Sequence, residues 1–291
     1  MSEACVAITF WGVRGSIPSP GAQSALIGGN TPCVELHTPA GRRVVLDAGT
    51  GLRPLGRMLE REGAGEIDIL LTHFHRDHIE GLPFFAPLHR RDVRVRVHAP
   101  DQREGAPDAL LRARMAPVFA PAFDAVRAHF DVAPMPVATW ECAGMEVSSL
   151  RVRHPSVTLG LRIAVDGFVI AYIPDNELVG GHYDRDHRRR YDELVRFIAG
   201  ADVLIHDAMF VDAEYPTRIG WGHSTMSQAG LLAVHAGVRR LCLFHHAPER
   251  EDVDLLARVD SMQQGATGFR RVLGIELAAE ARTLVLRTGE S

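Results

Sequence analysis

A cluster of metal-type donors directly behind an apolar run constrains this chain more than any other feature. In LLTHFHRDHIEGLPFF, residues 70–85, the donors His73, His75, Asp77 and His78 fall within six positions. Imidazole and carboxylate groups bind divalent metals at about 2.0–2.2 Å. His73 and His75 share a face in extended backbone, while Asp77 and His78 follow at a bend and can face a second ion. The pattern therefore predicts the start of two metal sites rather than surface histidines placed by chance.

Further ligands are expected because four donors do not complete two sites. Three candidates each follow an apolar run where a strand should end: His154 in LRVRHPS, Asp175 in VIAYIPDNE and His245 in RLCLFHHAP. Taken singly, each has an ordinary interpretation as a turn or capping residue. Their order after the cluster favours metal binding. His246 beside His245 leaves open which imidazole reaches a metal, since neighbouring strand residues point to opposite faces.

Alternating strand and helix patterns predict an α/β fold. Residues 5–12, 33–38, 42–51 and 66–73 are strand-like and separated by turn-forming residues, with a helix expected over 50–63. Residues 101–131 have a helical pattern interrupted by prolines, which we interpret as a helical insertion over one face. Strand patterns resume at 145–177, and helix–strand pairs follow over 192–210 and 226–248. We expect residues 1–291 to form a single domain.

Composition excludes several classes of protein. The chain is 46% hydrophobic and 23% charged, which is typical of a globular protein with a core. Its net charge of −4 provides no overall positive field to attract nucleic acid. The four cysteines are scattered and predict free thiols, and neither an export signal nor an apolar run long enough for a membrane span is present. We therefore expect a cytoplasmic protein with no membrane partner.

From Thr9 to Pro248 the sequence resembles the metallo-β-lactamase superfamily, whose pattern is H-x-H-x-D-H, a distant His, an Asp and a final His. The resemblance implies an αββα four-layer sandwich. It also implies two metal sites, the first held by His73, His75 and His154, the second by Asp77, His78 and His245, with Asp175 bridging them. His245 is preferred over His246 because it aligns with the final L-T-H of the superfamily. A His/Asp site accepts zinc, which we favour, and also manganese or iron.

A second-shell residue is implied by the same resemblance. Asp47 in VVLDAGTG matches the early D-x-G of the superfamily, which lies beside the metals and orients their ligands. The alternative is that Asp47 caps the helix that follows it. The two roles are compatible.

Within the superfamily, LIHDA at 204–208 and GHSTMSQA at 222–229 resemble ribonuclease Z and related phosphodiesterases. This resemblance implies that His223 is the general acid and that Asp207 orients it. The chain departs from ribonuclease Z in having Asp207 in place of Glu, in IPDNE in place of G-D-T, and in lacking an obvious Gly/Pro-rich arm for tRNA. The opening FWGVRGSIPSPG resembles a bacterial phosphodiesterase-like subgroup, and there Arg14 is expected to meet a phosphate unless it is an ordinary surface residue.

These observations predict a dinuclear metal-dependent phosphodiesterase that cleaves a small, cyclic phosphodiester with a metal-bridging hydroxide. The catalytic residues would be Asp77, Asp207 and His223. The first alternative is a ribonuclease Z-like endonuclease that processes RNA 3′ ends. A lactone or other carbonyl ester hydrolase and a non-catalytic sensing module are the remaining ones. The resemblance also implies a homodimer.

Overall fold

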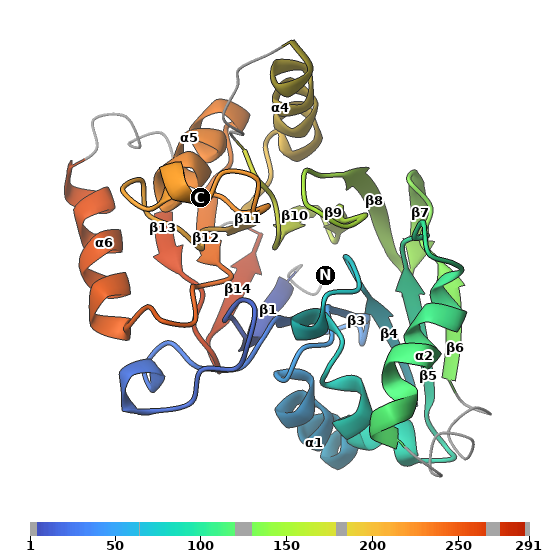
Figure 1. Cartoon of the computed structure of the whole chain (residues 1–291). Coiled ribbons are helices and arrows are strands. Elements are labelled where there is room, and N and C mark those ends of the chain that lie inside the picture. The colour runs from blue at the N-terminus through green and yellow to red at the C-terminus, as the bar shows by residue number, and fades with distance from the viewer. Residues whose placement is uncertain (1–4, 64, 120–129, 179–184, 266–273, 289–291) are drawn as a thin grey trace.

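The computed structural model of this chain describes residues 5–63, 65–119, 130–178, 185–265 and 274–288. Two seven-stranded sheets lie face to face, with helices on the outer side of each (Figure 1). This architecture confirms the αββα sandwich that the family resemblance implies.

The first sheet is antiparallel at one side and parallel at the other. Its order is β14 (Thr283–Arg287), β1 (Cys5–Gly12), β2 (Cys33–His37), β3 (Arg43–Leu46), β4 (Glu66–Leu70), β5 (Arg94–Ala99) and β6 (Phe130–Pro134). Pairing is antiparallel from β14 to β3 and parallel from β3 to β6. Because β14 pairs with β1, strands from both ends of the chain meet in this sheet.

The second sheet repeats this plan in the other half of the chain. Its order is β13 (Gly274–Leu277), β12 (Arg240–Phe244), β11 (Val203–Asp207), β10 (Phe168–Ile173), β9 (Leu159–Val165), β8 (Met145–Arg151) and β7 (Thr139–Cys142). Pairing is parallel from β13 to β10 and antiparallel from β10 to β7.

Helices cover the outer face of each sheet. α1 (Leu52–Glu62) and α2 (Pro107–Phe119) pack on the first sheet, and α4 (Arg185–Ile198), α5 (Met226–Ala236) and α6 (Asp252–Gly265) lie over the second (Figure 1). Short 3₁₀ turns lie in the loops between elements: η1 (Ala22–Ser24), η2 (Arg76–His78), η3 (Leu82–Phe84), η4 (Ala86–His89) and η7 (Tyr215–Thr217). The expected helix over 50–63 is α1, which ends at Gly63 in the left-handed conformation with φ 75°.

The segment interpreted as an insertion, 101–131, is part of the first sheet's own connectivity. Its helix is α2, which joins the parallel strands β5 and β6 as a crossover connection. Phe130 and Asp131 already belong to β6, an edge strand that the sequence pattern missed. Residues 120–129 lie outside the described residues.

The core lies between the sheets, and the metal-type donors lie at its rim. Ile8 and Phe10 of β1 are buried in one cluster with Leu161, Ile205 and Phe244 of the second sheet. The parallel strands β3, β4, β10, β11 and β12 all end on the same rim of the sandwich. Ligand sites in α/β proteins form at the carboxyl ends of parallel strands, so this rim is where the donors should meet.

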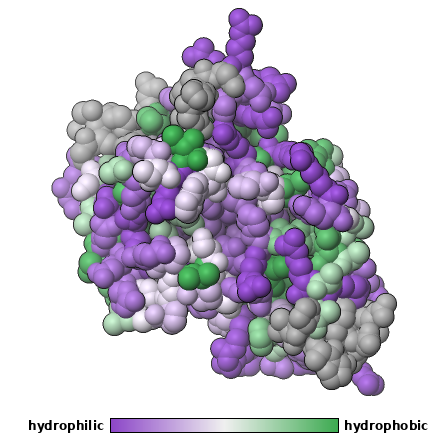
Figure 2. All heavy atoms as spheres, viewed as in Figure 1, coloured by the Kyte–Doolittle hydropathy of each residue, from purple (hydrophilic) through white to green (hydrophobic). Residues whose placement is uncertain are grey.

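The exposed surface carries many polar side chains, as expected for a chain with 23% charged residues. Figure 2 shows a largely hydrophilic face with small, separate hydrophobic patches. None of the helices in the described ranges is long and apolar enough to cross a bilayer.

Candidate metal centre

The turn after β4 positions the first four donors. The amide of Leu71 still donates to the carbonyl of His98 at 2.8 Å, so the backbone stays extended toward His73. The 3₁₀ turn η2 then closes as the amide of His78 donates to the carbonyl of His75 at 3.1 Å. His73 and His75 therefore leave an extended segment, whereas Asp77 and His78 leave a turn, as the spacing predicts.

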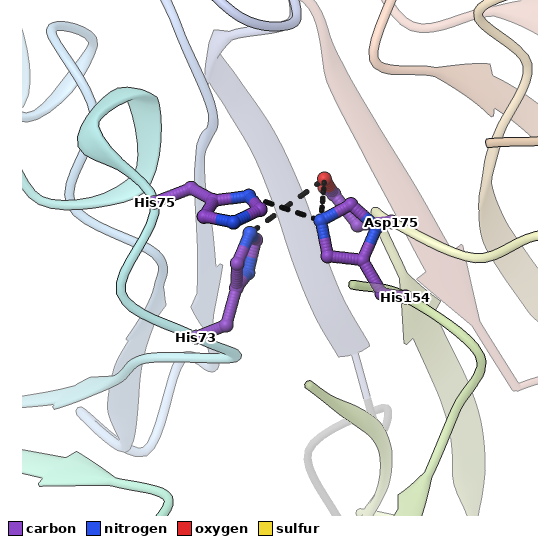
Figure 3. Close-up of side chains that lie close together, drawn as sticks. All are labelled: His73, His75, His154 and Asp175. Carbon is purple, nitrogen blue, oxygen red and sulfur yellow. Dashed lines mark hydrogen bonds and ion pairs between the residues drawn. The ribbon is translucent and has the colours of Figure 1, made fainter. Parts of the chain in front are cut away.

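The first donor group consists of His73, His75, His154 and Asp175, whose ligand atoms lie within 4.8 Å of one another (Figure 3). His154 Nε2 lies 3.0 Å from His75 Nδ1 and 3.5 Å from Asp175 Oδ2. His73 Nε2 lies 3.6 Å from the same carboxylate oxygen. Donors bonded at about 2.1 Å to one tetrahedral ion stand about 3.4 Å apart. The group therefore has the spacing of a single metal site.

The second donor group consists of Asp77, His78 and His245. His245 Nε2 lies 3.2 Å from Asp77 Oδ2 and 3.4 Å from His78 Nε2. His78 Nε2 is in turn 3.4 Å from Asp77 Oδ2. These separations match the same tetrahedral spacing of about 3.4 Å. A second ion fits this group.

Asp175 faces both groups with different oxygens. Its Oδ2 is directed at His73 and His154, while its Oδ1 lies 3.1 Å from His78 Nε2 and 3.3 Å from His245 Nε2. Buried His73 Nε2 has no hydrogen-bond partner among the described residues. Buried polar atoms rarely remain unpaired, so an unpaired imidazole nitrogen is suited to binding a metal ion. Two divalent ions would fit the two donor groups that Asp175 faces.

Burial keeps much of the first group neutral. It lowers the pKa of His73 well below the ordinary value and that of His75 to about 4, and it also lowers the pKa of His154. In the second group burial acts the same way on His78, but the carboxylates led by Asp175 outweigh it and raise the pKa. Neutral imidazole is the form that binds metal, and metal binding displaces any proton that competes for the ligand atom.

Hydrogen bonds to the other ring nitrogen orient three of the imidazoles. His154 Nδ1 donates to the carbonyl of Gly222 at 2.9 Å, and His73 Nδ1 lies 3.1 Å from Thr72 Oγ1. His78 Nδ1 donates to Asp47 Oδ2 at 2.9 Å. Each bond leaves Nε2 as the acceptor nitrogen directed at the donor group.

Asp47 lies directly behind the second donor group, where it bonds His78. It is fully buried with φ 58°, and it also accepts hydrogen bonds from the amide of Thr72 and from the hydroxyl of Tyr172, both at 2.8 Å. The alternative role as a helix cap does not apply, because α1 is preceded by Gly51 without a side-chain cap. Neither Thr72 nor Tyr172 was predicted from the sequence to contact this site. The adjacent T-H pair was a signal for Thr72, whereas Tyr172 is far along the chain and carried none.

His223 and Asp207 form the pair that the ribonuclease Z resemblance implies. His223 Nδ1 donates to Asp207 Oδ2 at 2.8 Å, and Asp207 is held by the amides of Asn176 and Met209 at 3.1 and 3.0 Å. Thr225 caps α5 with a reciprocal bond to Gln228, which anchors the segment carrying His223.

The environment of His223 raises its pKa. Burial alone lowers this pKa, but Asp207 and then Asp175 outweigh it and raise the value to about 9. The ring stacks on that of His245 at a centroid distance of 5.0 Å, and His223, Asp175 and His245 also form a donor group. His223 is therefore adjacent to the metal centre.

The structure distinguishes His245 from His246. His245 adopts a left-handed backbone, φ 58°, and directs Nε2 at Asp77 and Asp175. His246 Nε2 instead donates to the carbonyl of Ala278 at 3.0 Å, away from the donor groups. A side chain on Gly15 would collide with the His245 ring at 2.4 Å, so this glycine leaves room for the imidazole.

The structure contradicts the predicted role of Arg14. Its side chain is fully buried and donates to Asp252 Oδ1 at 2.6 Å and to the carbonyls of Gly28, Ala247 and Arg250 at 2.7, 3.3 and 2.6 Å. Because this guanidinium is enclosed and paired, it cannot meet a substrate phosphate. Its Gly-flanked loop suggested exposure, whereas the tertiary fold covers it.

A double sheet between helices, with His and Asp donors at the strand ends, defines a metal-binding hydrolase of the metallo-β-lactamase fold. Residues 42–246, more than half of the chain, match the family described as the β-lactamase superfamily domain. The chain belongs to this superfamily.

Curated relatives cover most of the chain. A ribonuclease Z of Haloferax volcanii is 26% identical and aligns with 81% of this chain and 83% of its own length. A ribonuclease Z of Bradyrhizobium diazoefficiens is 28% identical over 86% of this chain and 93% of its own.

Solved structures share the fold. YhfI, a metallo-β-lactamase fold protein of Bacillus subtilis, has a TM-score of 0.70 at 17% identity and covers 97% of this chain and 100% of its own. A diphosphatase of the PhnP family has a TM-score of 0.67 at 19% identity and covers 97% of this chain and 98% of its own. Human short-form tRNase Z has a TM-score of 0.61 at 20% identity and covers 96% of this chain and 98% of its own. At these identities, the likeness shows the architecture alone.

Proposed function

We propose that this chain is a metal-dependent phosphodiesterase acting on a small, cyclic phosphodiester. The observation that carries the proposal is Asp175, whose two oxygens separately face two buried donor groups, with the His223–Asp207 pair alongside. Two closely spaced metal positions and an adjacent proton donor match what diester cleavage requires.

Seven residues would hold the metals. His73, His75 and His154 take one ion, Asp77, His78 and His245 take the other, and Asp175 bridges them. We favour zinc, with manganese and iron as alternatives, because imidazole and carboxylate donors accept all three. When bound, the ions supply Lewis acidity and activation of the attacking water.

His223 supplies the proton for the leaving oxygen. With Nδ1 held by Asp207, the remaining donor is Nε2. Positioned proton donors contribute about 10²–10⁴-fold where the leaving group is a poor alkoxide. Asp207 is a positioning residue in this scheme, because it acts through the imidazole.

A cationic groove supports an anionic substrate. A cavity of about 680 Å³ begins at the same turn, lined by Arg76, Ile79 and Glu80 together with Arg53, Phe84 and Arg114. The three arginines are exposed, and Glu80 is the one acidic residue among the described residues of this lining, which does not include the metal-type donors themselves. Their excess positive charge would attract phosphate esters despite the net negative charge of the chain.

A second candidate is an RNA 3′-processing endonuclease. The two ribonuclease Z relatives support it, because each aligns with more than four-fifths of this chain. The net charge of −4 weighs against a large polyanionic substrate.

The test compares diesters on protein loaded separately with zinc and with manganese. Bis-p-nitrophenyl phosphate, cyclic nucleotides, other cyclic phosphates and a precursor tRNA are offered to the wild type, Asp77→Ala and His223→Ala. We expect Asp77→Ala to lose hydrolysis of every diester. His223→Ala should lose about 10²–10⁴-fold on alkoxide leaving groups and much less on p-nitrophenolate.

The outcomes separate the candidates. Turnover of cyclic diesters without tRNA cleavage supports the proposal, and tRNA cleavage alone supports the endonuclease. Carbonyl ester hydrolysis without diester cleavage, or metal binding without any turnover, would overturn both.

Three broader expectations remain proposals. We propose that residues 1–291 form a single domain, supported by the pairing of β14 with β1. A homodimer is proposed from the family resemblance, and size measurement in solution tests it. A cytoplasmic location is proposed from the free thiols.

A further inference from the structure

We propose that Asp68, His98 and Cys142 form a third metal site, suited to zinc and separate from the metal centre. Asp68 lies on β4, His98 on β5, and Cys142 ends β7 of the other sheet. Their ligand atoms lie within 4.8 Å of one another. An ion here would link the two sheets.

Strand register explains why these side chains meet. β4 and β5 are parallel, with Asp68 opposite Arg96 and Leu70 opposite His98. The alternate residues Ile67 and Val97 pack against the outer helices, so Asp68 and His98 project from the opposite face, toward the second sheet. Cys142 reaches them from that sheet, where it belongs to the inter-sheet core.

The geometry is that of converging ligands. His98 Nε2 lies 3.0 Å from Asp68 Oδ1 and 3.7 Å from Cys142 Sγ. Tetrahedral zinc would place nitrogen and oxygen donors about 3.3 Å apart and nitrogen and sulfur donors about 3.6 Å apart. A catalytic Cys–His–Asp relay is excluded because it needs the acid on one ring nitrogen and the sulfur on the other. Here both contact Nε2.

Charge and burial are compatible with a cation. Asp68 and Cys142 are 7% and 5% exposed. The guanidinium of Arg96 lies 3.7 Å from Asp68 Oδ1, but its other end pairs with Glu66 at 2.8 Å, which offsets its positive charge. Burial, followed by Asp68, raises the pKa of the thiol to about 12, so metal binding would release a proton from sulfur.

Cobalt(II) substitution tests the site independently of the proposed function. The donors of the metal centre are imidazole and carboxylate, so a thiolate-to-cobalt charge-transfer band reports the sulfur site alone. We expect the full-length wild type to show this band. We expect Cys142→Ser to lose it together with one equivalent of bound cobalt or zinc. Cys242→Ser, which alters a second buried thiol, should keep both.

The wild-type spectrum alone can overturn the proposal, so it does not depend on the variants folding. Absence of the band at saturating cobalt refutes the site, as does a band that persists in folded Cys142→Ser. His98→Gln is a second variant, at a half-buried position, and should lose the same equivalent of metal. Hydrolysis of diesters should survive in both variants, which separates this site from the metal centre.

Discussion

The ion pair of Arg14 with Asp252 and the metal centre are both buried and charged. They differ in how completely their polar atoms are hydrogen-bonded. The guanidinium of Arg14 donates to Asp252 and to three carbonyls. In the metal centre, His73 Nε2 has no hydrogen-bond partner among the described residues, and the ligand atoms of the donors point toward one another. The Arg14 cluster is saturated because its partners lie within the chain, whereas the donors of the metal centre are unsaturated and have the spacing that suits a bound ion. The two clusters therefore differ in how their atoms are paired, although both are buried.

Removing Asp175 should produce the largest effect, because it joins both halves of the unsaturated cluster. We expect Asp175→Ala to abolish diester hydrolysis and to lower the number of bound metal ions, measured by elemental analysis. Asp92→Ala, at a side chain 68% exposed, is the control and should behave as wild type. Full metal content and activity in Asp175→Ala would show that Asp175 does not hold the metals.

Breaking the saturated cluster should affect stability rather than chemistry. Asp252→Ala leaves Arg14 buried without its ion pair and should cost about 3–5 kcal/mol in the free energy of unfolding. Asp254→Ala, two residues along α6 at a side chain 38% exposed, should cost less than about 1 kcal/mol. Urea denaturation measures both. The distinction would fail if folded Asp252→Ala lost activity at unchanged stability.

An intermediate effect is expected at Asp47, which supports the metal centre without facing the ions. Asp47→Asn keeps the shape and tolerates the left-handed backbone, but it weakens the bond that orients His78. Metal affinity should fall about 10–100-fold. Competition with a chelator measures this loss, and an unchanged affinity would show that Asp47 has no orienting role.

The smallest effect is expected at His246, next to a predicted ligand but bonded away from it. His246→Gln can keep the bond to Ala278 and should leave metal content unchanged, whereas His245→Gln should lose metal. If the two variants behave the other way round, the assignment of the ligand is wrong.

Local pattern was sufficient for much of the centre. The order of His73, His75, Asp77 and His78 on a strand end and a turn follows from their spacing, because backbone geometry over a few residues is set locally. The later strand ends could also be predicted, since apolar runs closed by a polar residue are visible in the sequence. Asp175 was recognisable in this way.

Long-range packing could not be predicted in the same way. The edge strand β6 was missed because only Phe130 of its five residues is buried, and its strand conformation comes from pairing with β5. Tyr172 was missed because its contact with Asp47 spans the two sheets. Its strand pattern is that of any buried residue.

The sequence by itself determined the α/β class, the donor types and their order along the chain. Only the tertiary structure decided that Arg14 is enclosed by Asp252, that His245 rather than His246 faces the donors, and that Cys142 meets Asp68 and His98. The reason is physical: residue spacing sets the direction of a side chain relative to its own strand. What it meets depends on how the two sheets pack.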